Sequence, residues 1–235
     1  MKYQENIKAF KNLKKPKAII FDWDNTLANT WPLITKSIDE TMVYMGKEPW
    51  GEEKVKGSVH KSMRESFPEI FGDDWEKAGE FYRNKYRSIH LGIELIDGAR
   101  ESIDKIESAG IIQFVVSNKV GTTLRKEVKE VGVQDKFFSC IGASDAEFDK
   151  PAQNPVDLAL MGSGIDLEKD EIWFVGDTLT DVECAFNCGI TPVIYGDEGF
   201  VSSTIPEKIY QEGRNGSGPV ACFFDYGSFS NQAFR

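Results

Sequence analysis

Short apolar runs alternate along much of the chain with segments in which apolar residues recur at helical spacing. The apolar runs predict buried strands at 18–21, 111–116, 137–141, 172–175, 192–195 and 221–224. The intervening segments predict helices at about 98–109, 122–130, 155–161 and 181–188, most of them ended by a glycine. Strands that alternate with helices in this way favour right-handed β-α-β units, so the pattern predicts an α/β fold with a parallel sheet.

One stretch interrupts the alternation with helical patterns alone. Residues 30–93 show helical spacing, rich in aromatic residues and Met, at 31–45, 59–67 and 75–90, with a charged loop or short helix at 51–57. Pro68 is expected to stop the second of these helices. The aromatic side chains are expected to form a small core of their own. We therefore predict an α/β core of residues 1–29 and 94–235 and an inserted helical cap of residues 30–93, placed to cover a site.

Polar side chains follow several of the predicted strands where each strand ends. In parallel sheets, ligands bind at the carboxyl ends of the strands, so these side chains are expected to share one site. Each has an ordinary alternative: a lone lysine is usually solvated, and an aspartate at a helix start usually caps it. Their convergence on one edge favours function over these alternatives. They are Asp22, Asp24, Ser117, Asn118, Lys150, Asp177 and Asp181.

The net charge and the residue composition argue against several other classes of function. The net charge of −10, from 28 basic and 38 acidic residues, argues against nucleic acid as a partner. Two histidines are too few for a multi-histidine metal site and leave little for a Ser-His-Asp triad. A calcium loop that starts at Asp22 fails, because Leu27 and Leu33 occupy the positions that need Gly and Glu.

The cysteines and the apolar runs indicate in which compartment of the cell the protein is expected. None of the four cysteines shows C-x-x-C spacing, and Cys184 and Cys188 are expected to be buried thiols on one helix. No disulfide framework is indicated, which fits a reducing cytoplasm. The apolar runs are too short for a signal peptide or a membrane span, so no membrane association is expected. No feature of the sequence indicates an oligomeric state.

Four short motifs follow one another in a fixed order and together resemble those of the haloacid dehalogenase (HAD) superfamily of phosphatases. They are Asp22-x-Asp24-x-Thr26-Leu27, Val115-Val116-Ser117-Asn118, Lys150-Pro151 and Gly176-Asp177-x-x-x-Asp181. The position of the helical insert is similar to that of the cap in phosphoglycolate-phosphatase-like and β-phosphoglucomutase-like members. The resemblance implies a Rossmann-like core of the HAD type with an all-helical cap.

Three positions depart from the family pattern. Asn25 stands where Gly is usual, and because asparagine tolerates a left-handed backbone, the turn is expected to survive. Asn29 replaces an Asp of many relatives, which puts a polar contact near the cap in question. Gln153 replaces a second Pro after Lys150-Pro151. None of these changes removes a group that performs chemistry.

The resemblance implies a role for each motif residue. Asp22 would be the nucleophile that forms an aspartyl-phosphate, and Asp24 would protonate the leaving oxygen and then deprotonate water. Mg²⁺ would be held by Asp22, the main-chain carbonyl of Asp24 and Asp177, with Asp181 orienting metal-bound water.

The remaining motif residues would bind the phosphate. Ser117, the Asn118 N–H and Lys150 would contact its oxygens. Thr26 is placed with this group, and part of the role of its hydroxyl would be to stabilise the turn. Substrate recognition in this family comes largely from the cap. The cap candidates are Ser58, His60, Lys61 and Arg64, with Arg83 and Arg87 as weaker ones.

These roles indicate a Mg²⁺-dependent phosphatase that acts on a small phosphorylated metabolite. A phosphosugar mutase uses the same core and stays an alternative, as does a non-catalytic protein that binds a phospho-ligand. Hydrolytic dehalogenation needs no acid two residues after the nucleophile, so Asp24 argues against it. Phosphonate cleavage would need a Schiff-base lysine in the cap, where Lys54, Lys56 and Lys61 are ordinarily surface residues.

Overall fold

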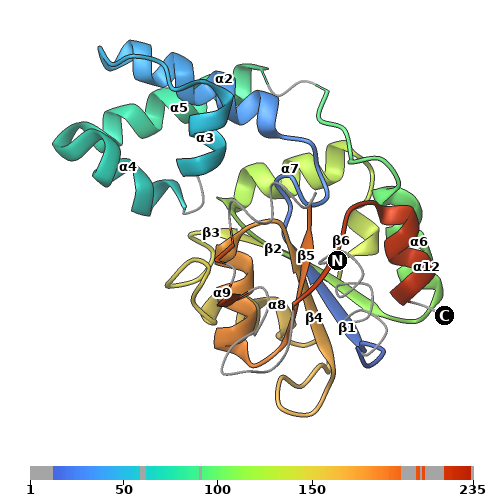
Figure 1. The fold of residues 1–235 in the computed structure, drawn as a ribbon. Helices are drawn as coiled ribbons and strands as arrows, with labels where there is room; N and C mark the ends of the chain where they lie inside the picture. Colours follow the sequence, from blue (N-terminus) through green and yellow to red (C-terminus); the bar gives the residue numbers. More distant parts are fainter. Residues whose placement is uncertain are drawn as a thin grey trace.

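The structure is a computed structural model that describes residues 13–58, 62–89, 92–196, 205–206, 208–209 and 220–233. These residues form an α/β core and a group of helices set apart from it (Figure 1). Within these ranges, no helix is both long enough and apolar enough to cross a bilayer.

A six-stranded sheet with the order β3-β2-β1-β4-β5-β6 forms the centre of the core. All neighbouring strands run parallel, which confirms the predicted parallel sheet. The strands are β1 (Ala18–Phe21), β2 (Ile112–Val120), β3 (Ser139–Ala143), β4 (Ile172–Gly176), β5 (Thr191–Tyr195) and β6 (Ala221–Phe223). The chain passes from β1 to one side of the sheet and later returns to the other side, so β1 lies at the switch point where parallel sheets bind ligands.

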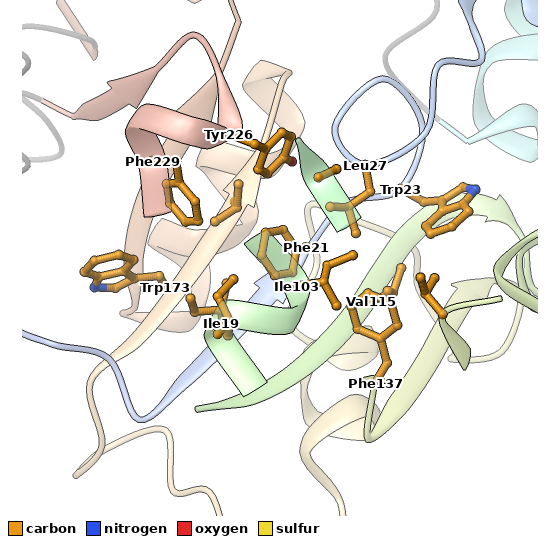
Figure 2. Close-up of a cluster of buried hydrophobic side chains, with 14 of the residues drawn as sticks. Ile19, Phe21, Trp23, Leu27, Ile103, Val115, Phe137, Trp173, Tyr226 and Phe229 are labelled. Carbon is orange, nitrogen blue, oxygen red and sulfur yellow. The ribbon is translucent and has the colours of Figure 1, made fainter. Parts of the chain in front are cut away.

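The side chains of β1 alternate between the two faces of the sheet, as strand geometry requires. Ile19 and Phe21 pack on one face with helices α6 (Ala99–Ser108), α7 (Gly121–Glu130) and α12 (Tyr226–Ala233), as Figure 2 shows in part. Ala18 and Ile20 pack on the other face with α8 (Asn154–Leu160) and α9 (Leu179–Cys188), where Cys184 and Cys188 are buried as predicted. Each face of β1 is thus fully covered, which fixes the loop that follows it.

Helix α12 attaches the C-terminal part of the chain to this core. Tyr226 and Phe229 are fully buried beside Phe21 (Figure 2). The Tyr226 hydroxyl donates a hydrogen bond of 2.7 Å to the carbonyl of Thr26. The sequence shows no motif here, yet this helix supports the loop that carries the candidate catalytic residues.

The helical cap consists of α2 (Trp31–Tyr44), α3 (Gly51–Ser58), α4 (Met63–Phe71), a 3₁₀ turn (Gly72–Asp74) and α5 (Trp75–Ile89). Its helices enclose their own cluster of buried apolar and aromatic side chains, which confirms the expected small core. The two connections to the core pair with each other, through a bridge between Ala28 and Leu95 and a hydrogen bond from the Asn29 N–H to the Glu94 carbonyl. The bounds of the cap at residues 30 and 93 stay a prediction.

Pro68 does not end its helix, contrary to the expectation from sequence. Helix α4 continues through Pro68 to Phe71. A proline inside a helix loses one backbone hydrogen bond and strains the preceding turn, at a cost of about 3 kcal/mol. Phe67 and Phe71 flank it and are both buried in the cap core, and burying each contributes about 1.5–3 kcal/mol. Packing in the cap therefore outweighs the local preference.

Two strand bounds also differ from the sequence pattern. Strand β2 extends to Val120 instead of ending before Ser117, with an irregularity between Val116 and Val120, and β3 starts at Ser139 instead of Phe137. Strand β2 pairs with β3 up to Val116 and again at Val120, so Ser117 and Asn118 lie in the irregular part of the strand between these two pairs.

Candidate active site

Three buried carboxylates meet at the carboxyl ends of β1 and β4. Asp22 directly follows β1, Asp177 directly follows β4, and Asp181 lies in the first turn of α9. Since β1 and β4 are neighbours, the Asp22 N–H still bonds to the Val175 carbonyl, at 2.8 Å. Carboxylate oxygens of the three aspartates lie within 4.8 Å of one another, and each of the three residues is at most 7% exposed. This grouping is one that a cation could occupy.

Lys150 is the cation that the chain itself supplies to this cluster. Its Nζ lies 2.8 Å from Asp22 Oδ1 and 2.6 Å from Asp181 Oδ1. Burial lowers the pKa of Lys150, but the two carboxylates raise it more, so the ammonium stays charged. An ammonium has three N–H donors. Two of them are used here, and the third is the donor available to a phosphate oxygen.

Asp181 also has the structural role that its position at a helix start suggests. Its Oδ2 accepts hydrogen bonds from the Thr178 N–H and hydroxyl, at 3.0 and 2.7 Å, in a capping box. Its Oδ1 remains for Lys150. Gly176 makes this approach possible, because a Cβ there would lie 2.3 Å from Asp181 Cγ. The capped helix thus holds Asp181 in one orientation toward the cluster.

The cluster holds more negative charge than Lys150 balances. Burial raises the pKa of Asp22 to about 6 against the opposing effect of Lys150, and the charges of Asp181 and Asp24 add to the rise. Burial and the charge of Asp22 raise the pKa of Asp177 well above its usual range. Another positive charge would relieve both carboxylates. Oxygen ligands of this kind suit a hard divalent cation such as Mg²⁺.

Asn118 joins the second motif to the third. Its Oδ1 accepts a hydrogen bond from the Lys150 N–H and its Nδ2 donates one to the Lys150 carbonyl, both at 3.0 Å. The side chain of Asn118 therefore fixes the backbone from which the lysine extends. Ser117 is 4% exposed and lines the pocket beside Asp22. Its hydroxyl accepts a long hydrogen bond from the Lys119 N–H, at 3.3 Å, and can still donate.

The turn after Asp24 depends on an asparagine in place of the usual glycine. Asn25 has a φ of 59°, which confirms the expected left-handed backbone. Its Oδ1 accepts hydrogen bonds from the N–H groups of Thr30 and Trp31, at 3.1 and 2.8 Å. Asn25 thus supplies both the turn and the acceptor for the start of α2. The asparagine thus adds a link between the loop after β1 and the cap.

Thr26, which was predicted to contact the phosphate, lies beside Asp177. The residue is fully buried and is not among those that line the pocket. Its hydroxyl donates to Asp177 Oδ1 at 3.1 Å. The Thr26 hydroxyl thus orients a carboxylate of the cluster, and its contact with a phosphate stays a prediction.

A pocket lies between this cluster and the cap. Asp22, Asp24 and Lys150 form its floor, and the cap side is largely apolar. The cap contributes Trp31, Ile34, Ile38, Met63, Phe67 and Tyr82, together with Arg83 and Arg87. Within the part of the chain that the structure describes, neither arginine forms an ion pair with a carboxylate. Two positive charges therefore face the pocket from α5.

Of the four cap residues favoured from the sequence, the two that the structure describes are not among the residues that line the pocket. Ser58 is exposed, and neither it nor Arg64 is among the residues that line the pocket. Arg64 instead pairs with Asp149 of the core, at 2.5 Å, and donates to the Glu147 carbonyl. Arg64 therefore ties the cap to the core. His60 and Lys61 lie outside the described residues.

Lys119, which the motifs do not include, lies directly beside Asp24. Its Nζ is 2.5 Å from Asp24 Oδ1 and 3.1 Å from Glu127 Oε2. The sequence holds one signal for it. Glu127 falls on the apolar side of its helix with Leu124 and Val128, and a buried carboxylate at such a position needs a cationic partner. That requirement could have directed attention to the lysine that follows Asn118.

Comparison with known proteins agrees with the motifs. Residues 19–194 match the family model described as haloacid dehalogenase-like hydrolase. A phosphoglycolate phosphatase from Chromobacterium violaceum is 25% identical over 79% of this chain and 87% of its own length. A pyrophosphatase, PpaX, from Listeria innocua is 29% identical over 78% of this chain and 87% of its own length.

Solved structures show the same fold. The structure of CbbY from Rhodobacter sphaeroides in complex with phosphate covers 88% of this chain and 93% of that one, with a TM-score of 0.70 at 17% identity. The family match covers most of the chain, including all four motifs and the cap between the first two. The chain therefore belongs to the haloacid dehalogenase-like hydrolases.

Proposed function

We propose that the chain is a Mg²⁺-dependent phosphatase that hydrolyses a small phosphate monoester through an aspartyl-phosphate on Asp22. The observation that carries this proposal is the buried group of Asp22, Asp177 and Asp181 around Lys150 at the floor of a pocket. The named activities of the two relatives, on phosphoglycolate and pyrophosphate, support a phosphoryl compound as substrate.

The first half of the reaction transfers the phosphoryl group to Asp22. One carboxylate oxygen of Asp22 attacks phosphorus while Lys150 and Ser117 hold the equatorial oxygens. The bond from phosphorus to the leaving oxygen breaks, and Asp24 gives its proton to that oxygen. A neutral alcohol then leaves toward the cap.

The three buried carboxylates, whose oxygens lie within 4.8 Å of one another, support a divalent cation at this place, and the raised pKa values of Asp22 and Asp177 agree with it. Asp22, the Asp24 carbonyl and Asp177 would hold Mg²⁺, with Asp181 in position to orient its water. When bound, Mg²⁺ supplies the positive charge that offsets the repulsion between Asp22 and an anionic phosphate. Thr26 and Thr178 keep the carboxylates of Asp177 and Asp181 oriented.

The second half of the reaction releases phosphate. Asp24, now a carboxylate, takes a proton from a water molecule that attacks phosphorus. The bond between Asp22 and phosphorus breaks, and Asp22 returns as a carboxylate. A phosphosugar mutase would instead return the phosphoryl group to a sugar hydroxyl, with the same residues.

The cap side of the pocket favours a substrate that carries a second anionic group. Arg83 and Arg87 lie one helical turn apart on α5, so both can face the pocket. Arginine binds carboxylate or phosphate through paired N–H donors. The relatives' substrates, phosphoglycolate and pyrophosphate, each hold a second anion beside the phosphoryl group. We therefore propose a compact phosphate compound with a carboxylate or second phosphate as the substrate class.

Removing both pocket arginines is expected to weaken the binding of such substrates selectively. A charged hydrogen bond contributes about 1.5–3 kcal/mol, so Arg83→Met with Arg87→Met should raise KM for phosphoglycolate at least about tenfold. The KM for p-nitrophenyl phosphate, which has no second anion, should change less than about threefold. Lys77→Met, on the same helix but not in the pocket, serves as the control. Equal changes in KM for both substrates would contradict the assignment.

Phosphate release from a panel of esters tests the proposed function. Release should require Mg²⁺, stop with a chelator and resume when Mg²⁺ is restored. A hexose phosphate that is isomerised without phosphate release would favour the mutase. Binding of phosphorylated compounds without turnover of any ester would favour the non-catalytic alternative and overturn the proposal.

A further inference from the structure

Lys119 lies in a closed network at the edge of the pocket that the proposed reaction does not explain. Its side chain is 7% exposed. Its Nζ contacts Asp24 Oδ1 at 2.5 Å, the Tyr86 hydroxyl at 2.8 Å and Glu127 Oε2 at 3.1 Å. These partners come from the β1 loop, the cap helix α5 and the core helix α7, so Lys119 joins three parts of the fold.

Glu127 holds Lys119 from the core side. It is fully buried, and its Oε2 also accepts a hydrogen bond of 2.8 Å from Trp23 Nε1. Trp23 lies between Asp22 and Asp24 in the sequence and is fully buried at the edge of the core cluster (Figure 2). A buried carboxylate is costly unless it is paired and hydrogen-bonded. Here the pairing connects the backbone that carries Asp24 to the lysine that contacts its side chain.

Tyr86 holds Lys119 from the cap side. Besides the hydrogen bond to its hydroxyl, the Lys119 ammonium lies 4.6 Å from the centre of the Tyr86 ring. Tyr86 is 4% exposed and belongs to the hydrophobic core of the cap. The position of Tyr86 relative to Lys119 therefore depends on how the cap sits on the core.

The donors of Lys119 are fully used. An ammonium has three N–H groups, and Asp24, Tyr86 and Glu127 provide three acceptors. No donor is left for a phosphate oxygen, although Lys119 lines the pocket. Lys150 differs, since it has two partners and one remaining donor. Lys150 is therefore the lysine suited to bind substrate, whereas Lys119 is suited to hold another side chain in place.

We propose that Lys119 is the residue that positions Asp24 for proton transfer, and that Tyr86 makes this positioning depend on a seated cap. The inference rests on the proposed function, because it assigns a supporting residue to the acid of that reaction. Asp24 rests on the β1 loop and points toward the pocket, and Lys119 fixes the direction of its carboxylate.

The charge of Lys119 also favours the transfer itself. As the bond from phosphorus to the leaving oxygen breaks and the bond to Asp22 forms, the Asp24 proton moves to the leaving oxygen. Asp24 thereby gains a negative charge next to the Lys119 ammonium, which stabilises it. An ester whose leaving group departs readily as an anion needs little of this help, whereas an alkyl ester needs all of it.

The test compares two classes of substrate in the intact protein. We expect Lys119→Met to lower kcat/KM for an alkyl phosphate, such as phosphoglycolate, at least about 100-fold, within the range for general acid catalysis. For p-nitrophenyl phosphate the loss should stay below about fivefold. Tyr86→Phe, which removes only the hydroxyl, should give a smaller loss with the same preference. Lys126→Met, an exposed lysine on α7, is the matched control and should leave both values unchanged.

Lys119→Met leaves Glu127 buried without its cation, so this variant could lose activity by misfolding. A second variant controls for that outcome. Lys119→Met with Glu127→Gln removes both charges and keeps an acceptor for Trp23. It should melt as one cooperative transition and show the same selective loss. Equal losses on both esters in a folded variant, or no loss on either, would overturn the positioning role. Absence of turnover of either ester by the wild type would instead overturn the proposed function.

Discussion

Replacing Asp22 with asparagine is expected to abolish phosphate release while leaving the fold intact. The amide is nearly isosteric and its oxygen still accepts from Lys150, but it cannot attack phosphorus. Loss of a catalytic nucleophile lowers turnover by many orders of magnitude, so we expect a decrease of at least about 10⁴-fold in kcat. The measurement is phosphate release in the presence of Mg²⁺, for the wild type and Asp22→Asn prepared together.

The same variant should be more stable than the wild type in the absence of divalent cations. The pKa of Asp22 is raised from 3.8 to about 6 in the folded protein, so its charged form opposes folding above that pH. At pH 7, asparagine should increase the free energy of unfolding by on the order of 1–3 kcal/mol. Well below the ordinary pKa of 3.8, at about pH 2–3, both states hold the proton and the difference should disappear. A variant that is less stable than the wild type at pH 7 would show that burial does not disfavour the charged form of Asp22.

Lys150→Met is expected to have the second largest effect, on both activity and stability. It removes the donor available to phosphate and leaves Asp22 and Asp181 buried without their cation. Breaking a buried ion pair on one side costs about 3–5 kcal/mol. We expect kcat to fall by at least about 10³-fold and the midpoint of urea unfolding to fall clearly.

An exposed lysine provides the control for this effect. Lys169 pairs with Asp166 at the surface, and its side chain is 78% exposed. Lys169→Met should change neither turnover nor the unfolding midpoint, because exposed pairs are screened by water. Equal behaviour of the two variants would show that Lys150 is not the buried partner of the carboxylates.

The convergence of the motif residues could be predicted because it follows from topology. Residues that end neighbouring parallel strands must meet at one edge of the sheet, whatever the details of packing. Asp22 and Asp177 end adjacent strands, and the alternation of strands and helices was enough to place them together. The left-handed turn at Asn25 was likewise readable, since few other residues adopt it.

Features that depend on tertiary packing could not be predicted. Pro68 breaks helices in isolation, but the buried phenylalanines on either side keep its helix intact. The partner of Arg64 is a core aspartate 85 positions away, which no local pattern reveals. Tyr226 supports the loop after β1 although it lies 200 positions further along the chain. In each case the interaction joins segments that are distant in sequence.

The residues of the cap that line the pocket also could not be identified from the sequence, for a physical reason. Helical spacing shows which residues of α5 share a face, but not which face turns toward the core. Arg83 and Arg87 therefore could not be ranked above Arg64 from the pattern alone. The packing of Tyr86 on Lys119 fixes the rotation of α5, and with it the two arginines that face the pocket.

Direct detection of a phosphorylated Asp22 tests whether the reaction passes through an aspartyl-phosphate. The protein would be mixed with Mg²⁺ and a substrate from the panel, quenched in acid within one turnover and analysed by peptide mass spectrometry. We expect a transient phosphate on the peptide that contains Asp22, absent from Asp22→Asn. Turnover without this intermediate, or phosphate on another residue, would contradict this expectation.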